Sequence, residues 1–562
     1  MTEWLHPSLW LFLGAAIVPL LRGRAQQAWM LLLPVAVIGV VVLLGQTPGE
    51  FGHTSLFGME MVLIRVDSLS LVFAYVFTLI TLIGALYALH IKDTTQHVAA
   101  LTYAGSALGV VFAGDLLTLY VFWELMVFTS VWLIWCRRNP DSLAAGTRYL
   151  MVHALGGLLL LVGIVLYYQQ TGSLRFDAID VGGPAFYLIL VGFIINAAVP
   201  PLHAWLADAY PEATVTGAIF LSAMTTKTAV YTLIRGYPGT ELLVGLGVAM
   251  TLYGVVYAVL ANDIRRLLAY HIISQVGFMV TGVGMGTIMA LNGSASHAFT
   301  HILYKALLFM GAGAVIHMTG RAKLTELGGL YRHMPITFLL FMIGALSIST
   351  FPLFSGFVSK TMVLEAAALD QRAVVWLLLA TASTGTFLSI GLKLAWFAFF
   401  AQDSGLRPKE APLNMLLAMG IAAFFCVFLG IFPGYLYAIM PAPVDYNAYS
   451  VGHVLWELQL LLFTGLGFFV LLKQVSATRR IVVDTDWVYR RLLPRLADRL
   501  QRLVDTVWNG GLGLVAQQFD RVVREVSRHH EPSGALARTW PTGSMVLWVA
   551  VLLAASLLVY YF

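Results

Sequence analysis

Apolar stretches long enough to cross a lipid bilayer recur along almost the whole chain, and this feature limits its fold more than any other. The hydrocarbon core of a bilayer is about 30 Å thick, which about 20 apolar residues span as a helix. Only 11% of the 562 residues are charged, whereas an average soluble domain has about 25%. A body with so few charges is solvated by lipid. The sequence therefore predicts an all-α, polytopic membrane protein.

The apolar runs predict 15 or 16 transmembrane helices. Spans are expected near residues 8–21, 28–45, 68–90, 98–113, 115–136, 149–168, 184–200, 214–235, 240–261, 264–284, 295–318, 336–352, 373–400, 411–432, 454–473 and 543–561. A cleavable signal peptide is not expected, because the N-terminal flank carries Glu3 and because Arg22 and Arg24 follow the first apolar run.

Several functional classes are excluded by what the sequence lacks. Two cysteines, Cys136 and Cys426, are too few for a disulfide framework, a metal cluster or an iron–sulfur site. The sequence has no P-loop, no dinucleotide-binding glycine pattern and no nucleophile elbow. Its net charge of +5 is spread over loops and the C-terminal tail, which indicates membrane orientation and not nucleic-acid binding. We therefore expect no cofactor and no metal site, and any redox chemistry would belong to partner subunits.

Two polar, proline-containing segments interrupt otherwise apolar territory. One runs from Asn196 to Pro211 and the other from Ser347 to Phe357, and each contains a Pro-Leu pair. Proline ends or kinks a helix, and the freed backbone groups cannot face lipid, so both breaks are expected to line a protein-enclosed cavity. Interrupted helices at matching places in two halves are typical of repeat transporters with a pathway near the membrane midplane. The alternative is that the two breaks match by coincidence.

The segment from Asp484 to His530 has a different pattern. Apolar residues recur at helical spacing with arginines between them, which predicts a surface-lying amphipathic helix. Pro494 and the pair Gly510-Gly511 are expected to kink or divide it. A last apolar run, from Met545 to Phe562, re-enters the bilayer. The helix is either a simple anchor or a brace against neighbouring proteins.

The positions of the lysines suggest proton transfer. Loops and tail use arginine, whereas four of the eight lysines lie within or beside apolar stretches: Lys227, Lys305, Lys360 and Lys393. Arginine stays charged under ordinary conditions, but a buried lysine can lose its proton when its surroundings change. A proton relay needs groups that can lose and regain a proton, as a buried lysine can.

Glu124 and Lys227 lie near the middle of predicted spans. An ionised acid there costs about 2.5–3.5 kcal/mol unless it is paired or hydrated. Lys227 is too far from either helix end to extend its amine to the interface. Both positions favour a functional role. The structural alternatives are a protonated Glu124 bonded to a neighbouring helix and a Lys227 solvated by its flanking threonines.

His297, His301 and Lys305 are spaced i, i+4 and i+8, so they share one face of a predicted helix. Three titratable groups on one face of a lipid-embedded helix resemble a proton wire, because each would be costly against lipid tails. Structural polarity is one alternative. A metal site is another, but no acidic ligand is near the two histidines and Lys305 would repel a cation.

Other titratable residues are weaker candidates. Lys393 lies nearer a helix end, where extension of its amine to the interface competes with a functional role. Lys360 follows the second break and has Glu365 five residues on. His203 and Asp208 lie in the first break, where helix capping and solvation of the loop are the alternative.

Three motifs carry a family resemblance: 114–124 (GDLLTLYVFWE), 201–211 (PLHAWLADAYP) and 297–311 (HAFTHILYKALLFMG). In this order they resemble the proton-translocating, antiporter-like subunit family. That family includes the large membrane subunits of respiratory complex I and the A and D subunits of Mrp-type cation/proton antiporters. The resemblance covers about residues 60 to 400 and implies two inverted five-helix repeats, each with a broken helix. The segment from Gly391 to Trp396 is similar to the Mrp D branch.

The resemblance also implies roles and boundaries. Glu124 corresponds to the family's glutamate, and Lys227 to the lysine that links two half-channels. His301 and Lys305 correspond to the central relay of the second half, and Lys393 to the terminal lysine. The expected parts are N-terminal helices 1–96, a first repeat 97–238, a second repeat 239–400, C-terminal helices 401–478, an amphipathic lateral helix 479–542 and a terminal span 543–562.

One position departs from the resemblance. The family usually has a lysine seven residues before the histidine of the Pro-Leu-His motif, as the ion partner of the glutamate. In this sequence that position is Asn196. Either Lys227 supplies the counter-charge for Glu124, or the first half works differently.

The function implied is that of a proton-translocating membrane protein, similar to the D-type Mrp proteins, within a multisubunit monovalent cation (Na⁺)/proton antiporter. It would lie in the bacterial inner membrane, with other membrane subunits as partners. One alternative is a proton channel in a complex I-like redox complex or in a proton-coupled inorganic-carbon uptake system. The other is a degenerate scaffold without transport, for which Asn196 is the best evidence.

Overall fold

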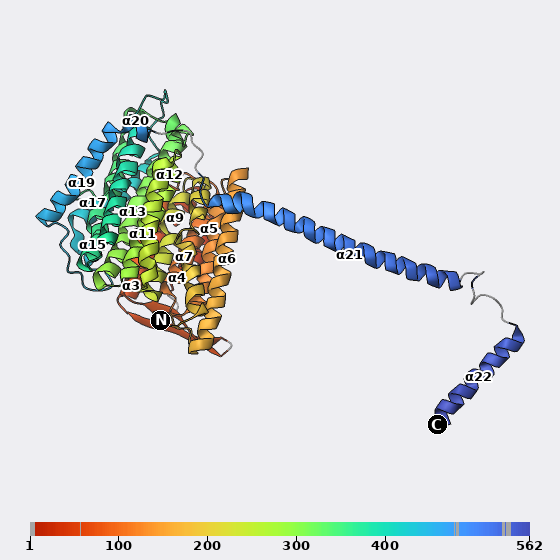
Figure 1. Cartoon of the computed structure of the whole chain (residues 1–562). Helices are drawn as coiled ribbons and strands as arrows, with labels where there is room; N and C mark the ends of the chain where they lie inside the picture. Colours follow the sequence, from red (N-terminus) through yellow and green to blue (C-terminus); the bar gives the residue numbers. More distant parts are fainter. Residues whose placement is uncertain are drawn as a thin grey trace. The chain divides into compact units, whose positions relative to one another are not determined.

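The computed structural model describes residues 6–56, 58–476, 478, 483–530, 534 and 541–561. The chain divides into two units, Met1–Asp486 and Trp487–Phe562, and each is described by itself. The first unit is a bundle of helices with one small hairpin (Figure 1).

The helices of the first unit follow in chain order. They are α1 (Pro7–Ile17), η2 (Val18–Leu20), α2 (Gly23–Gly45), α3 (Ser68–Tyr87), α4 (Thr94–Phe112), α5 (Leu116–Trp135), α6 (Pro140–Thr171), α7 (Pro184–Asn196), α8 (Ala204–Ala209), η3 (Tyr210–Glu212), α9 (Gly217–Ala223), α10 (Thr225–Gly236), α11 (Glu241–Leu260), α12 (Ile264–Met285), α13 (Ile288–Thr319), η4 (Leu324–Glu326), η5 (Leu330–Arg332), α14 (Pro335–Ile348), α15 (Ser355–Leu369), α16 (Ala373–Thr386), η6 (Phe387–Leu394), η7 (Trp396–Phe400), α17 (Leu413–Ile431), α18 (Pro433–Tyr437), α19 (Val451–Val470) and α20 (Leu472–Val475).

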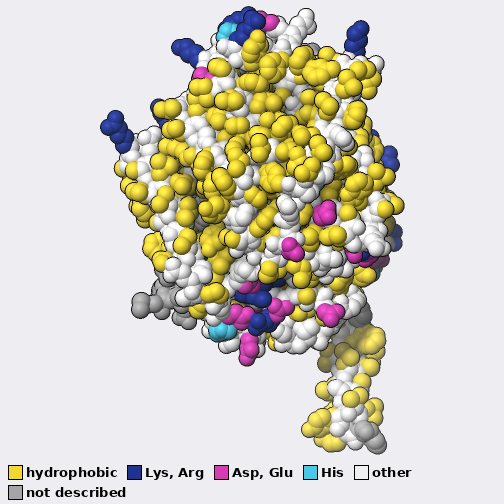
Figure 2. Space-filling view, turned by 90° about the vertical axis from the view of Figure 1, so that its left-hand side faces the viewer, with side chains coloured by type: hydrophobic (Ala, Val, Ile, Leu, Met, Phe, Trp, Pro, Cys, Tyr) yellow, Lys and Arg dark blue, Asp and Glu magenta, His cyan; other side chains and the backbone are white. Residues whose placement is uncertain are grey.

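The predicted membrane architecture is confirmed. Among the described residues, 12 helices are long and apolar enough to cross a membrane. Three shorter apolar helices, Pro7–Leu20, Pro184–Asn196 and Pro335–Ile348, match further predicted spans. The span expected near 98–113 corresponds to α4, which lies outside both groups. Hydrophobic side chains cover much of the face in Figure 2, as expected for a surface in contact with lipid.

The prediction left residues 46–67 without an element, and a β-hairpin lies there. Strands β1 (Gly49–Leu56) and β2 (Met59–Val66) pair antiparallel, with Leu56 opposite Met59 next to the turn. The backbone of Val62 joins the hairpin to the start of α5: its carbonyl accepts from Gly114 N at 3.0 Å, and its N–H donates to Asp115 at 3.0 Å. The hairpin is an addition to the predicted helices.

Both predicted helix breaks are present. The first separates α7 from α8, and the second separates α14 from α15. Ala198 in the first break and Thr350 in the second have left-handed φ values of 59° and 58°, which a continuing helix does not allow. A third interruption, at Met224 between α9 and α10, was not predicted. Helix α16 also passes into π-helical turns, η6 and η7, which are frequent at functional sites.

The centre of the first unit is formed by α9, α10, α12 and α13. In the apolar stretches of α9–α10 and α12 all residues are buried, and in that of α13 94% are buried. In the apolar stretch of α19 only 17% of the residues are buried. Glycines bring α11 close to α12: a Cβ at Gly254 would lie 2.5 Å from the backbone nitrogen of Ser274. Such close approach is typical of helix pairs in membranes.

The second unit contains the predicted amphipathic helix and the terminal span. A π turn, η8 (Val488–Leu492), leads into α21 (Leu493–His530), and α22 (Thr542–Tyr561) follows. Of the two outcomes expected for Gly510-Gly511, a kink or a division, the division is wrong, because α21 is continuous over its 38 residues. Each glycine costs about 1 kcal/mol in a helix, which a helix of this length can absorb.

Candidate functional site

Lys227 lies at the start of α10, next to the interruption at Met224. Its side chain is fully buried. Its ammonium donates to the carbonyl of Ser222 at 2.6 Å and to Thr226 Oγ1 at 3.1 Å. Ser222 belongs to α9, so the ammonium bonds across the interruption. One flanking threonine, Thr226, does bond the Lys227 ammonium, as expected if the lysine is only structural. The carbonyl of Ser222 is nonetheless the nearer partner.

The predicted titratable face of α13 is confirmed. His297, His301 and Lys305 are all fully buried, and the rings of the two histidines are 6.1 Å apart. Neither nitrogen of His301 nor the Nζ of Lys305 has a hydrogen-bond partner within the described part of the chain. A permanently charged ammonium without a partner is costly in such a place. The geometry therefore suits groups that gain and lose protons.

Lys360 lies on α15, directly after the second break. Its ammonium donates to the carbonyl of Ile348, the last residue of α14, at 3.1 Å, and lies 5.3 Å from the ring centre of Phe278. Glu365, the acid suggested by the sequence, is exposed. The acid that attracts Lys360 is the buried Glu457 of α19. Glu457 is not among the residues predicted from the sequence, although an isolated glutamate inside an apolar span is a visible signal.

Glu457 also contacts the second break. It accepts a hydrogen bond from Thr350 Oγ1 at 3.0 Å. Thr350 has a left-handed φ value, so the Glu457 carboxylate bonds the backbone region where the helix is interrupted. The second break therefore joins an acid from α19 with a lysine from α15.

Lys393 lies in the π segment η6 and is only 2% exposed. Its ammonium donates to the carbonyls of Val259 and Ala261, the latter at 3.2 Å. These carbonyls lie at the C-terminal end of α11, where the helix dipole favours a cation. The competing interpretation, an amine extended to the interface, does not match this buried position.

His271 of α12 connects the α13 face to this π segment. It is fully buried, and its Nε2 lies 2.6 Å from Ser389 Oγ in η6, four residues before Lys393. It also interacts electrostatically with Lys305 and Lys360. His271 is not among the site residues predicted from the sequence, because nothing local to it indicates its interactions with Ser389 and the two lysines.

Glu124 on α5 is half-buried, and its Oε1 has no hydrogen-bond partner in the ranges that the structure covers. It rests against Gly157 of α6: a Cβ at that glycine would lie 1.7 Å from Oε1. The described residues include no ion pair between Glu124 and Lys227 within 4.0 Å. Lys227 therefore does not replace the missing counter-charge by direct contact.

Asn196, the last residue of α7, is fully buried and bonded to a histidine that the sequence did not indicate. Its Oδ1 lies 2.7 Å from Nδ1 of His153 on α6. The His153 ring is 4.2 Å from that of Tyr149 and 4.3 Å from that of Trp205. The polar partner of Asn196 is thus an imidazole.

His203 and Asp208, from the first break, both bond side chains of other segments. Asp208 pairs with Arg148 through two bonds of 2.6 and 2.9 Å. His203 Nε2 lies 3.2 Å from Asp484, which also accepts from Tyr253 and Tyr270 at 2.5 and 2.6 Å.

Asp484 lies two residues before the end of the first unit. Burial by itself would raise its pKa, but the hydrogen bonds from His203, Tyr253 and Tyr270 hold the pKa of this carboxyl well below its usual range. The contact ties the chain that leads to α21 to the first break and to α11 and α12.

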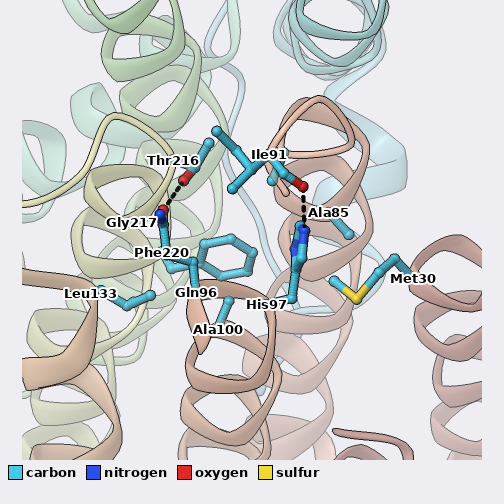
Figure 3. A pocket seen from close by; sticks show the side chains of 11 residues that line it. Met30, Ala85, Ile91, Gln96, His97, Ala100, Leu133, Thr216, Gly217 and Phe220 are labelled. Atoms are coloured by element: carbon cyan, nitrogen blue, oxygen red, sulfur yellow. Dashed lines mark hydrogen bonds between the residues drawn. The ribbon is translucent and has the colours of Figure 1, made fainter. Parts of the chain in front are cut away.

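A small cavity lies beside the start of α9 (Figure 3). Its polar lining is engaged in hydrogen bonds: His97 Nε2 lies 2.9 Å from the carbonyl of Ile91, and Thr216 Oγ1 lies 3.1 Å from Gln96 Oε1. Phe220 and Met30 supply apolar walls. None of the predicted site residues lines this cavity.

Comparisons with known proteins agree with this architecture. Residues 113–389 match the family model described as NADH:quinone oxidoreductase/Mrp antiporter, TM. The chain is 30% identical over 488 residues to the A subunit of the Na(+)/H(+) antiporter of Alkalihalophilus pseudofirmus, covering 76% of this chain and 60% of that protein. It is 30% identical over 355 residues to the uncharacterized protein MJ1309 of Methanocaldococcus jannaschii, covering 58% of this chain and 73% of that protein.

A solved structure has the same fold. A chain of the membrane-bound sulfane sulfur reductase, an archaeal respiratory membrane complex, superposes with a TM-score of 0.73. It is 24% identical and covers 99% of this chain and 100% of its own length. At this identity the likeness concerns the fold alone.

The fold and the buried titratable groups define a class, that of multi-pass helical membrane proteins with lysines and histidines beside interrupted helices. Within this class the chain belongs to the NADH:quinone oxidoreductase/Mrp antiporter transmembrane family. It spans 60% of the length of the Alkalihalophilus antiporter protein that it matches.

Proposed function

We propose that this protein is a proton-translocating component, similar to the D-type Mrp proteins, of a multisubunit monovalent cation (Na⁺)/proton antiporter in the bacterial inner membrane. Other membrane subunits are its partners. One observation supports the proposal: basic groups are buried inside the bundle. Lys227 lies beside the interruption at Met224, His301 and Lys305 lie on the continuous helix α13, and Lys393 lies in the π segment η6.

The proposed relay runs between the helix interruptions. Lys227, His301 and Lys305 interact electrostatically, and like charges repel strongly where the dielectric is low. A proton that arrives at Lys227 therefore disfavours a proton on the α13 face and drives it onward. His271 and Ser389 lead from Lys305 toward Lys393.

The proposed repeats are residues 97–238 and 239–400. Each contains one of the predicted breaks, and the π segment η6 falls within the second. We assign residues 1–96 and 401–478 to flanking membrane helices, 479–542 to a lateral brace and 543–562 to a terminal anchor.

Transport by the assembled complex tests the proposal. Lys305→Ala should abolish proton-coupled cation transport in proteoliposomes while the complex still assembles, because the central group of the relay is lost. Lys409→Ala is the matched control, since Lys409 is an exposed loop lysine. Normal coupling in Lys305→Ala would refute the relay.

Co-purification separates the other candidate functions. Cation-transporting membrane subunits are expected with this chain. Peripheral subunits that bind redox cofactors would instead indicate a redox complex, and a soluble zinc protein would indicate inorganic-carbon uptake. Wild-type complexes without any proton conductance would indicate a scaffold.

A further inference from the structure

The first half of the bundle contains a second line of polar groups, on α6. Tyr149, His153 and Gly157 are spaced i, i+4 and i+8 and therefore lie on one face of this helix. Glu124 of α5 lies against that face at Gly157. Glu124 therefore lies against the same face of α6 as His153, at a position four residues, or about 6 Å, further along the helix axis.

The contacts of His153 fix which nitrogen can accept a proton. Asn196 Oδ1, at 2.7 Å, is an acceptor, so Nδ1 carries a hydrogen and donates it. In the neutral ring, Nε2 then holds the lone pair. Nε2 is buried and has no hydrogen-bond partner among the residues described. Because Asn196 cannot titrate, a change of charge at this pair occurs on His153.

Other charged and titratable groups around this face have partners of their own. Arg148, five residues earlier on α6, is neutralised by Asp208 from α8. The Tyr149 hydroxyl lies 2.8 Å from Ser130 Oγ on α5. On the α8 side, the His153 ring contacts the uncharged Trp205. Among the described residues, Glu124 is the acid that lies against this face of α6, and its Oε1 has no hydrogen-bond partner.

A polar route leads from His153 toward Lys227. The His153 ring contacts Tyr149, whose hydroxyl interacts with Thr225 at the start of α10. Thr225 also bonds Tyr103 at 2.6 Å. The next residue, Thr226, accepts from the ammonium of Lys227 at 3.1 Å.

We propose that His153, oriented by Asn196, carries the proton between Glu124 and Lys227 in the first half of the protein. The O–H bond of the protonated carboxyl breaks and an N–H bond forms at Nε2, which leaves a Glu124 carboxylate and an imidazolium on the same face of α6. The N–H bond at Nε2 then breaks as an N–H bond forms at the neutral amine of Lys227, with the hydroxyls of Tyr149 and Thr225 relaying the proton. The inference rests on the proposed function and adds a proton-carrying group to it.

The test uses the complete assembly in proteoliposomes. His153→Gln keeps a donor for Asn196 but does not titrate, and it should lower proton-coupled transport at least tenfold with assembly unchanged. His97→Gln is the matched control: His97 is also a buried histidine with a hydrogen bond, but it lies outside the route and should stay within twofold of wild type. Normal transport in His153→Gln would overturn the proposal.

Two further measurements separate a proton carrier from a packing residue. The pH profile of wild-type transport should contain a step that disappears from the residual activity of His153→Gln. Asn196→Lys in the His153→Gln background places a titratable group at the same pair and should restore part of the transport. An unchanged pH profile, or no rescue in an assembled complex, would contradict a proton-carrying role.

A further variant covers the case in which His153→Gln fails to assemble. Asn196→Asp should hold His153 protonated through an ion pair and block transport in an assembled complex; normal transport would overturn the proposal. Lys305→Ala distinguishes a failure of the proton-carrying role of His153 from a failure of the proposed function. If Lys305→Ala abolishes transport while His153→Gln is normal, only the further inference fails. If Lys305→Ala transports normally, the proposed function fails.

Discussion

Helices α6 and α13 carry polar groups at the same spacing but surround them differently. On α6, His153 is hydrogen-bonded to a neutral amide, and an acid lies against the same helix face. On α13, His301 and Lys305 have no hydrogen-bond partner among the described residues, and Lys227 repels both. Equal spacing in the sequence therefore corresponds to two different electrostatic environments.

This difference suggests that the first and second halves of the bundle have different roles in proton transfer. A histidine beside an acid and an amide can exchange a proton locally, because the charged form gains an attractive partner. Bases that repel each other in a buried site transmit the arrival of a charge over a distance. The first half is thus suited to uptake of a proton, and the second half to passing the effect onward.

The largest effect is expected from removing the acid of the second half. Glu457→Gln takes away the attraction that favours the charged form of Lys360, so transport should fall at least tenfold. Transport assays in proteoliposomes measure this, with Glu365→Gln as the control because Glu365 is exposed on the same helix as Lys360. Equal transport in the two variants would show that the Glu457 carboxylate has no role in transport.

A smaller effect is expected from crowding the acid of the first half. In Gly157→Ala the new methyl group would lie 1.7 Å from Glu124 Oε1, so the carboxylate must move away from the α6 face. Transport should fall about three- to tenfold, and overpacking should cost about 1–3 kcal/mol of stability. Gly245→Ala is the control, because a Cβ at that helical position has nothing within 4 Å. Wild-type transport in Gly157→Ala would show that the position of Glu124 against α6 is unimportant.

The smallest effect on transport is expected at the contact between the first break and the chain leading to α21. Asp484→Asn should leave most of the transport and lower stability at pH 7 by about 1.5–3 kcal/mol, because a carboxylate with three donors loses its charge. The folded pKa of Asp484 is depressed, so this stabilisation is complete above the unfolded pKa of about 3.9 and is lost as the pH falls below it.

Thermal unfolding of the purified assembly at several pH values measures the effect of Asp484→Asn. The difference between variant and wild type should shrink as the pH is lowered below about 4. Asp505→Asn, at an exposed position on α21, should unfold like wild type at every pH. A pH-independent difference for Asp484→Asn would contradict the role of its charge.

The sequence predicted the membrane spans and both proline-containing breaks because each depends on local composition. It also predicted the face shared by His297, His301 and Lys305, since helical periodicity fixes which residues align. The interruption at Met224 was missed, because no proline or glycine marks it. The hairpin was missed because its strands, of eight residues each, are shorter than a membrane span and lie between long apolar runs.

Contacts between distant segments could not be predicted. Glu457 interacts electrostatically with Lys360 from a helix 97 positions later in the chain, and nothing local to Lys360 indicates it. The pairing of Asn196 with His153 depends on how α6 packs on α7. The hydrogen bond of His203 with Asp484 joins residues 281 positions apart. These contacts follow from tertiary packing, which one sequence does not specify residue by residue.

The central claim is that buried amines in this protein work by losing and regaining a proton. Lys305→Arg tests it most directly, because arginine keeps a positive charge at this position but does not release its proton under ordinary conditions. Proton-coupled cation transport by the assembled Lys305→Arg complex in proteoliposomes should be as low as that of Lys305→Ala. Transport at the wild-type rate would show that a fixed positive charge is sufficient and would contradict the relay.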